Sequence, residues 1–320
     1  MRATLRRRLG AAAAVAGAAV LSVAGIASGD EFDPGNSAPS VSSPSLSAAI
    51  VPDSGASNSQ YSYAVTVGDA DTLEDLSTVS VCLYRTSGGD ATCATPDPAT
   101  DVALTWTRAT GVFAVDDGGA NDYWANGTAP APSAPTLSAT SGTFTFTFTV
   151  SEAMREGGWT ATVTATDASA ASATDATATT AVAWYGAITA RVSQEFGTVA
   201  AGATGATGTS TPTVTANGTS TFGLSAGAFG SGGSSFSLAS GLPTDVPAAG
   251  EVALDCTMGA TFVEGSATRV GATETIAGTS QTPTGTPEGG SALASTCRLS
   301  HGGGRPIGTY TGTVVNTVGQ

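Results

Sequence analysis

Lysine is absent from this chain of 320 residues, and histidine occurs only once, as His301. These two residue types supply many of the general bases that enzymes use near neutral pH, so their scarcity removes most such groups. Ser225 in G-L-S-A-G and His301 in H-G-G-G match hydrolase motifs, but their order along the chain is reversed and no helix pattern follows Ser225. Turns in a glycine-rich chain explain both matches. We therefore expect a protein that is not an enzyme; a glycan hydrolase with paired carboxylates is the remaining catalytic alternative.

Positive charge is scarce as well. The chain has 11 arginines and 25 acidic residues, and four of the arginines lie within the first eight positions. If that segment is removed, 7 arginines remain against 25 acids, a net charge of −18. Nucleic acid and anionic lipid headgroups repel such a chain, so we expect neither as a partner. The composition fits a GC-rich genome or a salt-rich environment, and both interpretations stay open.

The one long apolar run lies at the N-terminus. Arginines at positions 2 and 6–8 precede an apolar stretch over 11–27, which is short and weakly hydrophobic for a membrane span. Ala27 and Gly29 suit a cleavage site before Asp30, so we predict a signal peptide over 1–29 and an extracellular or cell-surface location. The arginine pair also resembles a twin-arginine signal. With no lipobox cysteine, sorting motif or apolar anchor, we expect no membrane span in the mature chain.

Sustained helical repeats are lacking too, and period-two alternation takes their place. The clearest run is 143–150, in which phenylalanine or valine alternates strictly with threonine. Such alternation predicts strands with one buried and one solvated face. The best helical candidate is 151–156, a turn or two long. The alanine-rich stretch 167–183 is interrupted by threonine and aspartate, which predicts a loop leading into a strand.

The length that remains after the signal peptide predicts two domains. A Ser- and Pro-rich flexible leader is expected over 30–44, a first β-sandwich over 45–185 and a second over 186–320. The strands expected in the second domain are 188–192, 212–216, 235–238, 251–257 and 309–316.

Four cysteines follow the predicted cleavage site. An even number in an exported chain indicates disulfides, and three pairings exist. We favour Cys82–Cys93 and Cys256–Cys297, because each bridge then stays within one predicted domain. A zinc site does not fit, since the cysteines lack close spacing and the chain has one histidine.

Two acidic turns are candidate cation sites. The first holds Asp69, Asp71, Glu74 and Asp75, and the second holds Asp116, Asp117, Asn121 and Asp122. Calcium requires six to eight oxygen ligands, which clustered carboxylates and loop carbonyls supply. The candidate calcium ligands are Asp69, Asp71, Asp116, Asp117 and Asp122. The alternative is a pair of solvated acidic turns with no cofactor.

Two further surface features are predicted. Asn126 and Asn217 each begin an N-G-T sequence and are candidate N-glycosylation sites in turns. Trp106, Tyr123 and Trp124 form a candidate aromatic contact surface for glycans or proteins. We favour a core position for Trp106, which stands in an alternating run, and leave Trp124 open.

Four segments carry a resemblance to known proteins. Residues 158–167, GWTATVTATD, resemble the closing strand of immunoglobulin-like domains in exported bacterial and archaeal surface proteins, and the acidic turn 68–75 is similar to their early strands. Residues 196–202 and 308–314 resemble parts of matrix-fibre and surface β-sandwich proteins. The resemblance implies an all-β chain with two tandem immunoglobulin-like β-sandwich domains. Together with the predicted export signal and the scarcity of general bases, the sequence leads us to expect a non-enzymatic cell-surface or extracellular-matrix protein, a structural and adhesive module whose partners are surface proteins, matrix proteins or glycans.

An alternative is the subunit of an extracellular filament that assembles by β-strand addition. The leader over 30–44 has few β-branched residues, which weakens it as a donor strand. The terminal segment over 310–315 suits that role better.

Overall fold

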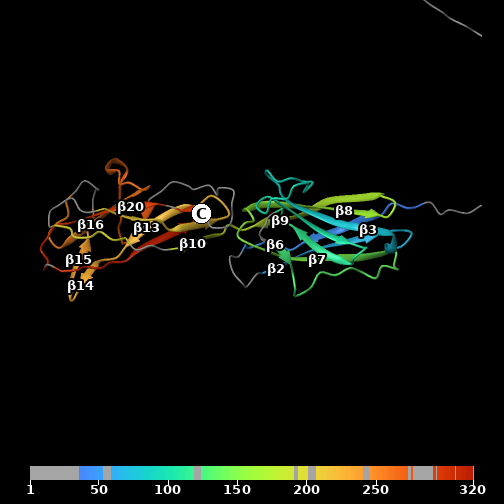
Figure 1. The fold of residues 1–320 in the computed structure, drawn as a ribbon, viewed down its shortest axis with the longest axis horizontal. Coiled ribbons are helices and arrows are strands. Elements are labelled where there is room, and N and C mark those ends of the chain that lie inside the picture. Colours follow the sequence, from blue (N-terminus) through green and yellow to red (C-terminus); the bar gives the residue numbers. More distant parts are fainter. Residues whose placement is uncertain are drawn as a thin grey trace, which may run out of the picture. The chain divides into compact units, whose positions relative to one another are not determined.

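The computed structural model describes residues 36–52, 59–118, 124–190, 194–200, 207–240, 246–272, 275–276, 291–292, 294–306 and 308–319. The predicted signal peptide over 1–29 and positions 30–35 of the predicted leader lie outside these ranges. Within them the regular elements are strands, apart from two short 3-10 turns, η1 (Leu73–Asp75) and η2 (Glu264–Ser266) (Figure 1). The all-β prediction is confirmed. None of the described residues form a helix with the length and hydropathy of a membrane span.

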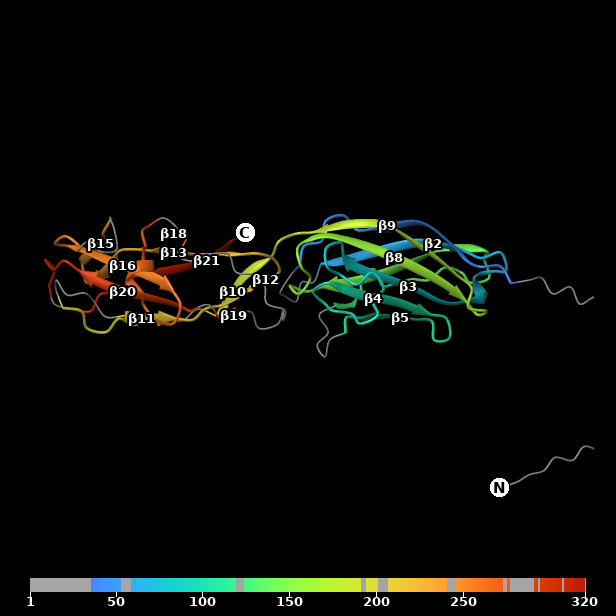
Figure 2. The same cartoon turned by 90° about the horizontal axis from the view of Figure 1, so that it is seen from above.

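Residues 40–182 form two antiparallel sheets (Figures 1 and 2). In the described chain one sheet has the order β1 (Ser40–Leu46), β2 (Gln60–Gly68), β7 (Ser141–Val150) and β6 (Trp124–Asn126). The other has the order β5 (Val112–Asp116), β4 (Asp101–Thr107), β3 (Leu76–Arg85), β8 (Gly157–Asp167) and β9 (Ser172–Val182). We call the second one the five-stranded sheet.

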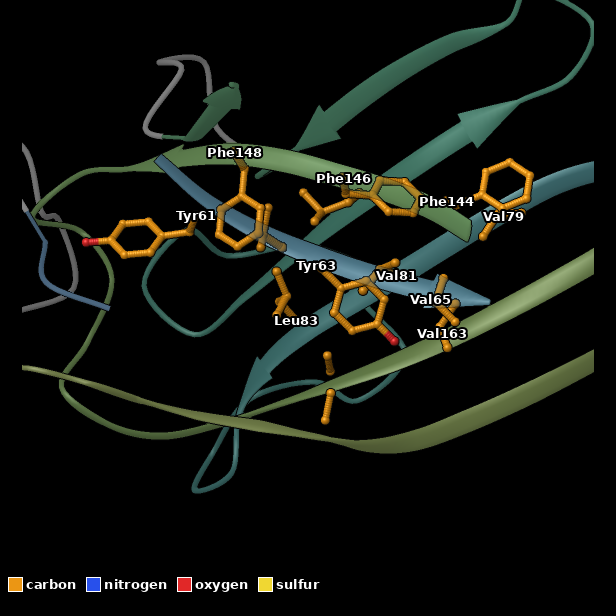
Figure 3. Close-up of a cluster of buried hydrophobic side chains, with 14 of the residues drawn as sticks. Tyr61, Tyr63, Val65, Val79, Val81, Leu83, Phe144, Phe146, Phe148 and Val163 are labelled. Atoms are coloured by element: carbon orange, nitrogen blue, oxygen red, sulfur yellow. The ribbon is translucent and has the colours of Figure 1, made fainter. Parts of the chain in front are cut away.

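One apolar core joins these two sheets, and it follows from the alternation. Phe144, Phe146 and Phe148 of β7 are all buried, and Figure 3 shows them with apolar side chains of β2, β3 and β8. Trp106 of β4 packs on Phe144 with 4.9 Å between ring centroids, which joins the sheets directly. Burial of each such side chain contributes roughly 1.5–3 kcal/mol.

The predicted leader over 30–44 is wrong at its C-terminal end, because β1 begins at Ser40. β1 pairs with β2 along one sheet edge, where Pro44, which has no N–H, falls at the irregularity between Ser42 and Ser45. Val41 packs partly on the core, so few apolar residues suffice for an edge strand. Farther along, the Ile50 amide donates to the Ala181 carbonyl of β9 at 2.8 Å, which links the edges of the two sheets.

One other prediction in this region is wrong. Residues 151–156 form a turn and not a helix, with the Met154 amide donating to the Ser151 carbonyl at 3.3 Å. The stretch 167–183 is a short turn that leads into a strand, as predicted, and the strand is the longer part, because β9 pairs with β8 from Ser172 to Val182. The exposed face of an edge strand needs no apolar residues, so alternation is weak there.

Residues 186–319 form three further sheets, and their strands pair only with one another in the described chain. The first has the order β10 (Gly186–Ala190), β12 (Thr213–Ala216), β19 (Ser291–Ala292). The second has the order β11 (Thr207–Ser210), β20 (Ser295–His301), β16 (Glu251–Met258), β15 (Ser234–Leu238), β14 (Phe229–Ser231), with β17 (Thr268–Arg269) also on β16. The third has the order β18 (Thr275–Ile276), β13 (Thr221–Ala226), β21 (Val314–Gly319).

Strands β10, β12, β15 and β16 overlap the predicted ones, whereas β11, β13, β14 and β20 were not predicted. These four are short and rich in glycine, serine and threonine, so they show little alternation. The terminal strand begins at Val314 and not at residue 309. The count of two immunoglobulin-like domains and the boundary near Tyr185 stay predictions.

Candidate functional site

Three carboxylates lie together among the turns at one end of the two sheets formed by residues 40–182. Asp69 directly follows β2, Asp75 ends η1 and Asp167 ends β8. β3 begins directly after Asp75 and pairs antiparallel with β8, which places Leu76 opposite Asp167. One carboxylate oxygen from each acid lies within 4.8 Å of the other two. We call Asp69, Asp75 and Asp167 the carboxylate triad.

Asp69 is the buried member with an unused oxygen. Its side chain is 3% exposed, and its Oδ1 accepts the Asp71 amide at 2.9 Å. Its Oδ2 is buried and accepts no hydrogen bond from the described residues. Burial raises the pKa of Asp69 above its usual range; the Asp71 amide opposes that shift, and the negative charges of Asp75, Asp71 and Asp167 add to it.

Asp167 is held in the ionised form by hydrogen bonds. Its Oδ2 accepts the Asn36 side-chain amide at 2.7 Å, and its Oδ1 accepts the Ser169 and Ala171 amides at 2.8 and 2.9 Å. The Asn36 bond is the largest cause that lowers the pKa of Asp167, and the backbone amides add to it. The Asn36 bond also ties the segment before β1 to the triad.

The surroundings of the triad are acidic. Asp71 is exposed and accepts the Ser37 amide at 2.8 Å, a second tie to the segment before β1. The ion pairs among the described residues involve Arg269 and Arg298, both in the second half of the chain. No arginine of the described chain therefore forms a salt bridge with the triad.

The predicted calcium ligands do not all converge. Asp69 belongs to the triad, while Asp71 is a neighbour that binds backbone. Asp116 of β5 lies opposite Ala103 of β4, which in turn lies opposite Cys82 of β3, so Asp116 is not near Leu76, where β3 begins beside the triad. The Asp116 Oδ1 accepts the Gly118 amide at 3.0 Å.

Asp117, the other described acid of the second acidic turn, is not part of the triad. Asp117 is buried and accepts the Trp124 amide at 3.2 Å. Asp122 lies outside the described residues. Asp167 was not predicted, because the sequence separates it widely from Asp69 and only the β3–β8 register brings the two together.

The cysteines pair as favoured, with bridges between Cys82 and Cys93 and between Cys256 and Cys297. Cys256 and Cys297 face each other across β16 and β20 and are fully buried. The second bridge therefore lies within the apolar core that packs on these strands.

The two N-G-T asparagines differ in exposure. Asn126 is exposed, and its side-chain amide donates to the Phe113 carbonyl at 2.8 Å. Asn217 is 2% exposed, and its amide donates to the carbonyls of Met154 and Ala183, both at 2.9 Å. In this structure only Asn126 presents its side chain to solvent as an acceptor should.

The sole histidine is engaged by backbone. His301 Nε2 lies 2.9 Å from the Val199 carbonyl, to which it donates, and Nδ1 accepts the Gly303 amide at 3.2 Å. Ser225 stands in β13 opposite Val315. Both ring nitrogens are used, so the arrangement does not present His301 as a base for Ser225.

The two described members of the candidate aromatic contact surface, Trp106 and Trp124, are buried and do not form an exposed surface. Trp106 is 1% exposed, as expected for the core, and Trp124 is 2% exposed and stacks near Phe148 and Trp159. Tyr123 lies outside the described residues.

Hydroxyl side chains line part of the outward side of the five-stranded sheet. Two rows cross β4, β3, β8 and β9 in register, and they consist of Thr107, Thr78, Thr166 and Ser172, and of Thr105, Ser80, Thr164 and Thr174. We call these eight residues the hydroxyl face. Neighbouring strands are about 4.8 Å apart, so the hydroxyls form a regular grid. Thr164 and Thr174 are joined directly, with 3.0 Å between their hydroxyl oxygens.

No protein-family model and no curated protein matches this chain. Among solved structures, titin domains Z1Z2 in complex with telethonin share 16% identity over 58% of this chain and 68% of that chain, with a TM-score of 0.22. A chaperone–tip adhesin complex of CFA/I fimbriae shares 13% over 87% and 96%, with a TM-score of 0.29. The C-terminal domain of the Streptococcus agalactiae AgI/II polypeptide BspA shares 11% over 86% and 96%, with a TM-score of 0.21. Likenesses this weak assign neither family nor function.

Proposed function

We propose that the protein is a non-enzymatic, exported cell-surface or extracellular-matrix protein that acts as a structural and adhesive interaction module. The observation that supports this is the hydroxyl face, which presents eight hydroxyl side chains in register across four strands. Each hydroxyl both donates and accepts hydrogen bonds, and removing it from water costs far less than removing a charge. Such a face suits neutral polar partners, namely glycans or the surfaces of other exported proteins.

The disulfides support a location outside the cell. Cys82–Cys93 and Cys256–Cys297 are both formed, and such bridges persist in oxidising compartments. A sandwich with a rigid core then serves as a spacer that holds the hydroxyl face in a fixed shape.

The test is binding to an array of polysaccharides and exported surface proteins. We expect the double variant Ser80→Glu, Thr164→Glu to lose binding, because two carboxylates then stand in the centre of the hydroxyl face. The matched control is Thr66→Glu, Thr143→Glu, two exposed threonines that face each other on the other sheet. Equal loss in both variants, or no binding by the unaltered protein, contradicts the proposal.

A filament subunit is the second candidate, and one observation favours it. β21 is the last strand of its sheet in the described chain, where it pairs with β13 from Val314 to Gly319, and the edge of a sheet is the place at which a further strand adds. Because β1 and β21 both pair within their own chain, assembly requires addition to that edge or exchange of a strand. Electron microscopy of the oxidised protein in high salt with calcium separates the candidates: regular fibres favour a filament, and isolated particles favour the module.

A further inference from the structure

The carboxylate triad carries negative charge that the described residues do not balance. Asp69, Asp75 and Asp167 each bring an oxygen within 4.8 Å of the others, and the ion pairs of the described chain lie elsewhere. Like charges this close disfavour one another, and the cost grows as burial reduces solvation. A site of this kind either carries extra protons or holds a cation.

The unused oxygen of Asp69 is the second and independent observation. Asp69 is 97% buried, its Oδ1 is satisfied by the Asp71 amide, and its Oδ2 accepts nothing from the described residues. Nearly all buried polar atoms in folded proteins have a partner, so an orphan carboxylate oxygen requires an explanation. A cation beside Asp75 and Asp167 supplies that partner.

We propose that Asp69, Asp75 and Asp167 bind one calcium ion. The spacing fits, because calcium–oxygen distances of about 2.3–2.6 Å allow two ligand oxygens to lie up to about 5 Å apart. The donors are all oxygens, which suits calcium, whereas zinc prefers nitrogen and sulfur. Magnesium demands shorter distances and near-ideal octahedral geometry, so a site spread over three turns favours the larger ion.

The ion would connect three separate segments of residues 40–182. It joins the turn after β2, the turn before β3 and the end of β8, and Asp167 also accepts the Asn36 side-chain amide, which attaches the segment before β1 to the same site. Neutralisation of the triad would also lower the free energy of the folded state, because carboxylate oxygens within 4.8 Å of one another repel.

Calorimetric titration of the chelator-treated, oxidised protein with calcium chloride tests the proposal. We expect one calcium per chain and a rise in the thermal unfolding midpoint when calcium is added. Asp69→Asn and Asp167→Asn should each weaken binding at least about tenfold and abolish the rise. Asp116→Asn is the matched control, because Asp116 belongs to the other acidic turn, and it should bind as the unaltered protein does.

Two further measurements separate a bound ion from a structural role of the acids. Without calcium, Asp69→Asn should unfold at the same temperature as the unaltered protein or above it, because the substitution removes repulsion from the triad. Magnesium should bind at least about tenfold more weakly than calcium. The proposal is overturned by absence of heat and of any midpoint shift at about 10 mM calcium, by equal binding of magnesium, or by equal loss in Asp116→Asn.

Discussion

The buried side-chain amide of Asn217 makes three hydrogen bonds to the backbone. Its Oδ1 accepts the Tyr185 amide at 2.7 Å, while its Nδ2 donates to the carbonyls of Met154 and Ala183. Asn217→Asp replaces that double donor with an oxygen facing two carbonyls, and it should lower the free energy of unfolding by about 2–5 kcal/mol. Asn126→Asp, at an exposed site, should cost less than about 1 kcal/mol. Denaturant unfolding of both variants checks this, and equal costs would contradict the buried role.

Asp90 provides a residue-scale prediction about pH. The Thr92 hydroxyl, followed by the Thr92 and Ala94 amides, lowers the pKa of this exposed carboxyl below its ordinary value of 3.8. A lowered folded-state pKa adds stability that is present above the unfolded value and is lost as pH falls through the folded one. Asp90→Asn should therefore lower the unfolding midpoint at pH 7, and the difference should shrink below about pH 4. Thermal unfolding of both proteins across this pH range measures the difference between their midpoints. A difference that grows as the pH falls would contradict the prediction.

Sequence patterns located two of the three triad acids and could not find the third. Asp69 and Asp75 stand in a visible acidic turn, although only Asp69 was named as a ligand, whereas Asp167 joins them only through the register of β3 and β8. Asn126 and Asn217 have the same local motif, yet one is exposed and the other is buried. Local sequence reports residue type and spacing, while burial depends on which distant segments pack on top.

At the scale of elements, alternation predicted the central strands and missed the edges. β2, β7 and β8 each bury one face against the core, so their sequences carry period two. β1 and β9 lie at sheet edges, where few side chains must be apolar, and their partners determine their structure. Among the strands missed in residues 186–319, β11 and β14 also lie at sheet edges, whereas β13 and β20 are inner strands whose glycine, serine and threonine residues weaken the alternation.

The two disulfides should stabilise the elements they join to different extents. Cys82–Cys93 closes a separation of 11 residues, whereas Cys256–Cys297 closes one of 41. In the chain-entropy model the bridges are worth about 3 and about 4 kcal/mol. We expect Cys256→Ala with Cys297→Ala to destabilise the protein more than Cys82→Ala with Cys93→Ala, with the added loss of buried sulfur contacts. The denaturant midpoints of the two double variants measure this difference. A lower midpoint for Cys82→Ala with Cys93→Ala than for Cys256→Ala with Cys297→Ala would contradict the chain-entropy model.

Net charge acts on the whole molecule. With 25 acidic residues and no lysine, the folded chain repels itself, and salt screens that repulsion. The screening length falls from about 10 Å at 0.1 M to about 3 Å at 1 M salt. In the presence of chelator, the unfolding midpoint should therefore rise steadily with sodium chloride over this range. A midpoint that falls would show that self-repulsion is not the dominant long-range term.

The paths of β1 and β9 have a mechanical consequence. Ser40 lies opposite Gly68 and Ser172 opposite Thr166, so both strands start at the end of the sandwich that holds the triad, and β9 leaves at the other end after Val182. Tension applied at Asn36 and Val182 therefore slides β1 along β2 and β9 along β8. Many hydrogen bonds must then break together, whereas pulling from Asn36 and Asp71 peels β1 from β2 one bond at a time. Single-molecule stretching should give a higher rupture force in the first geometry.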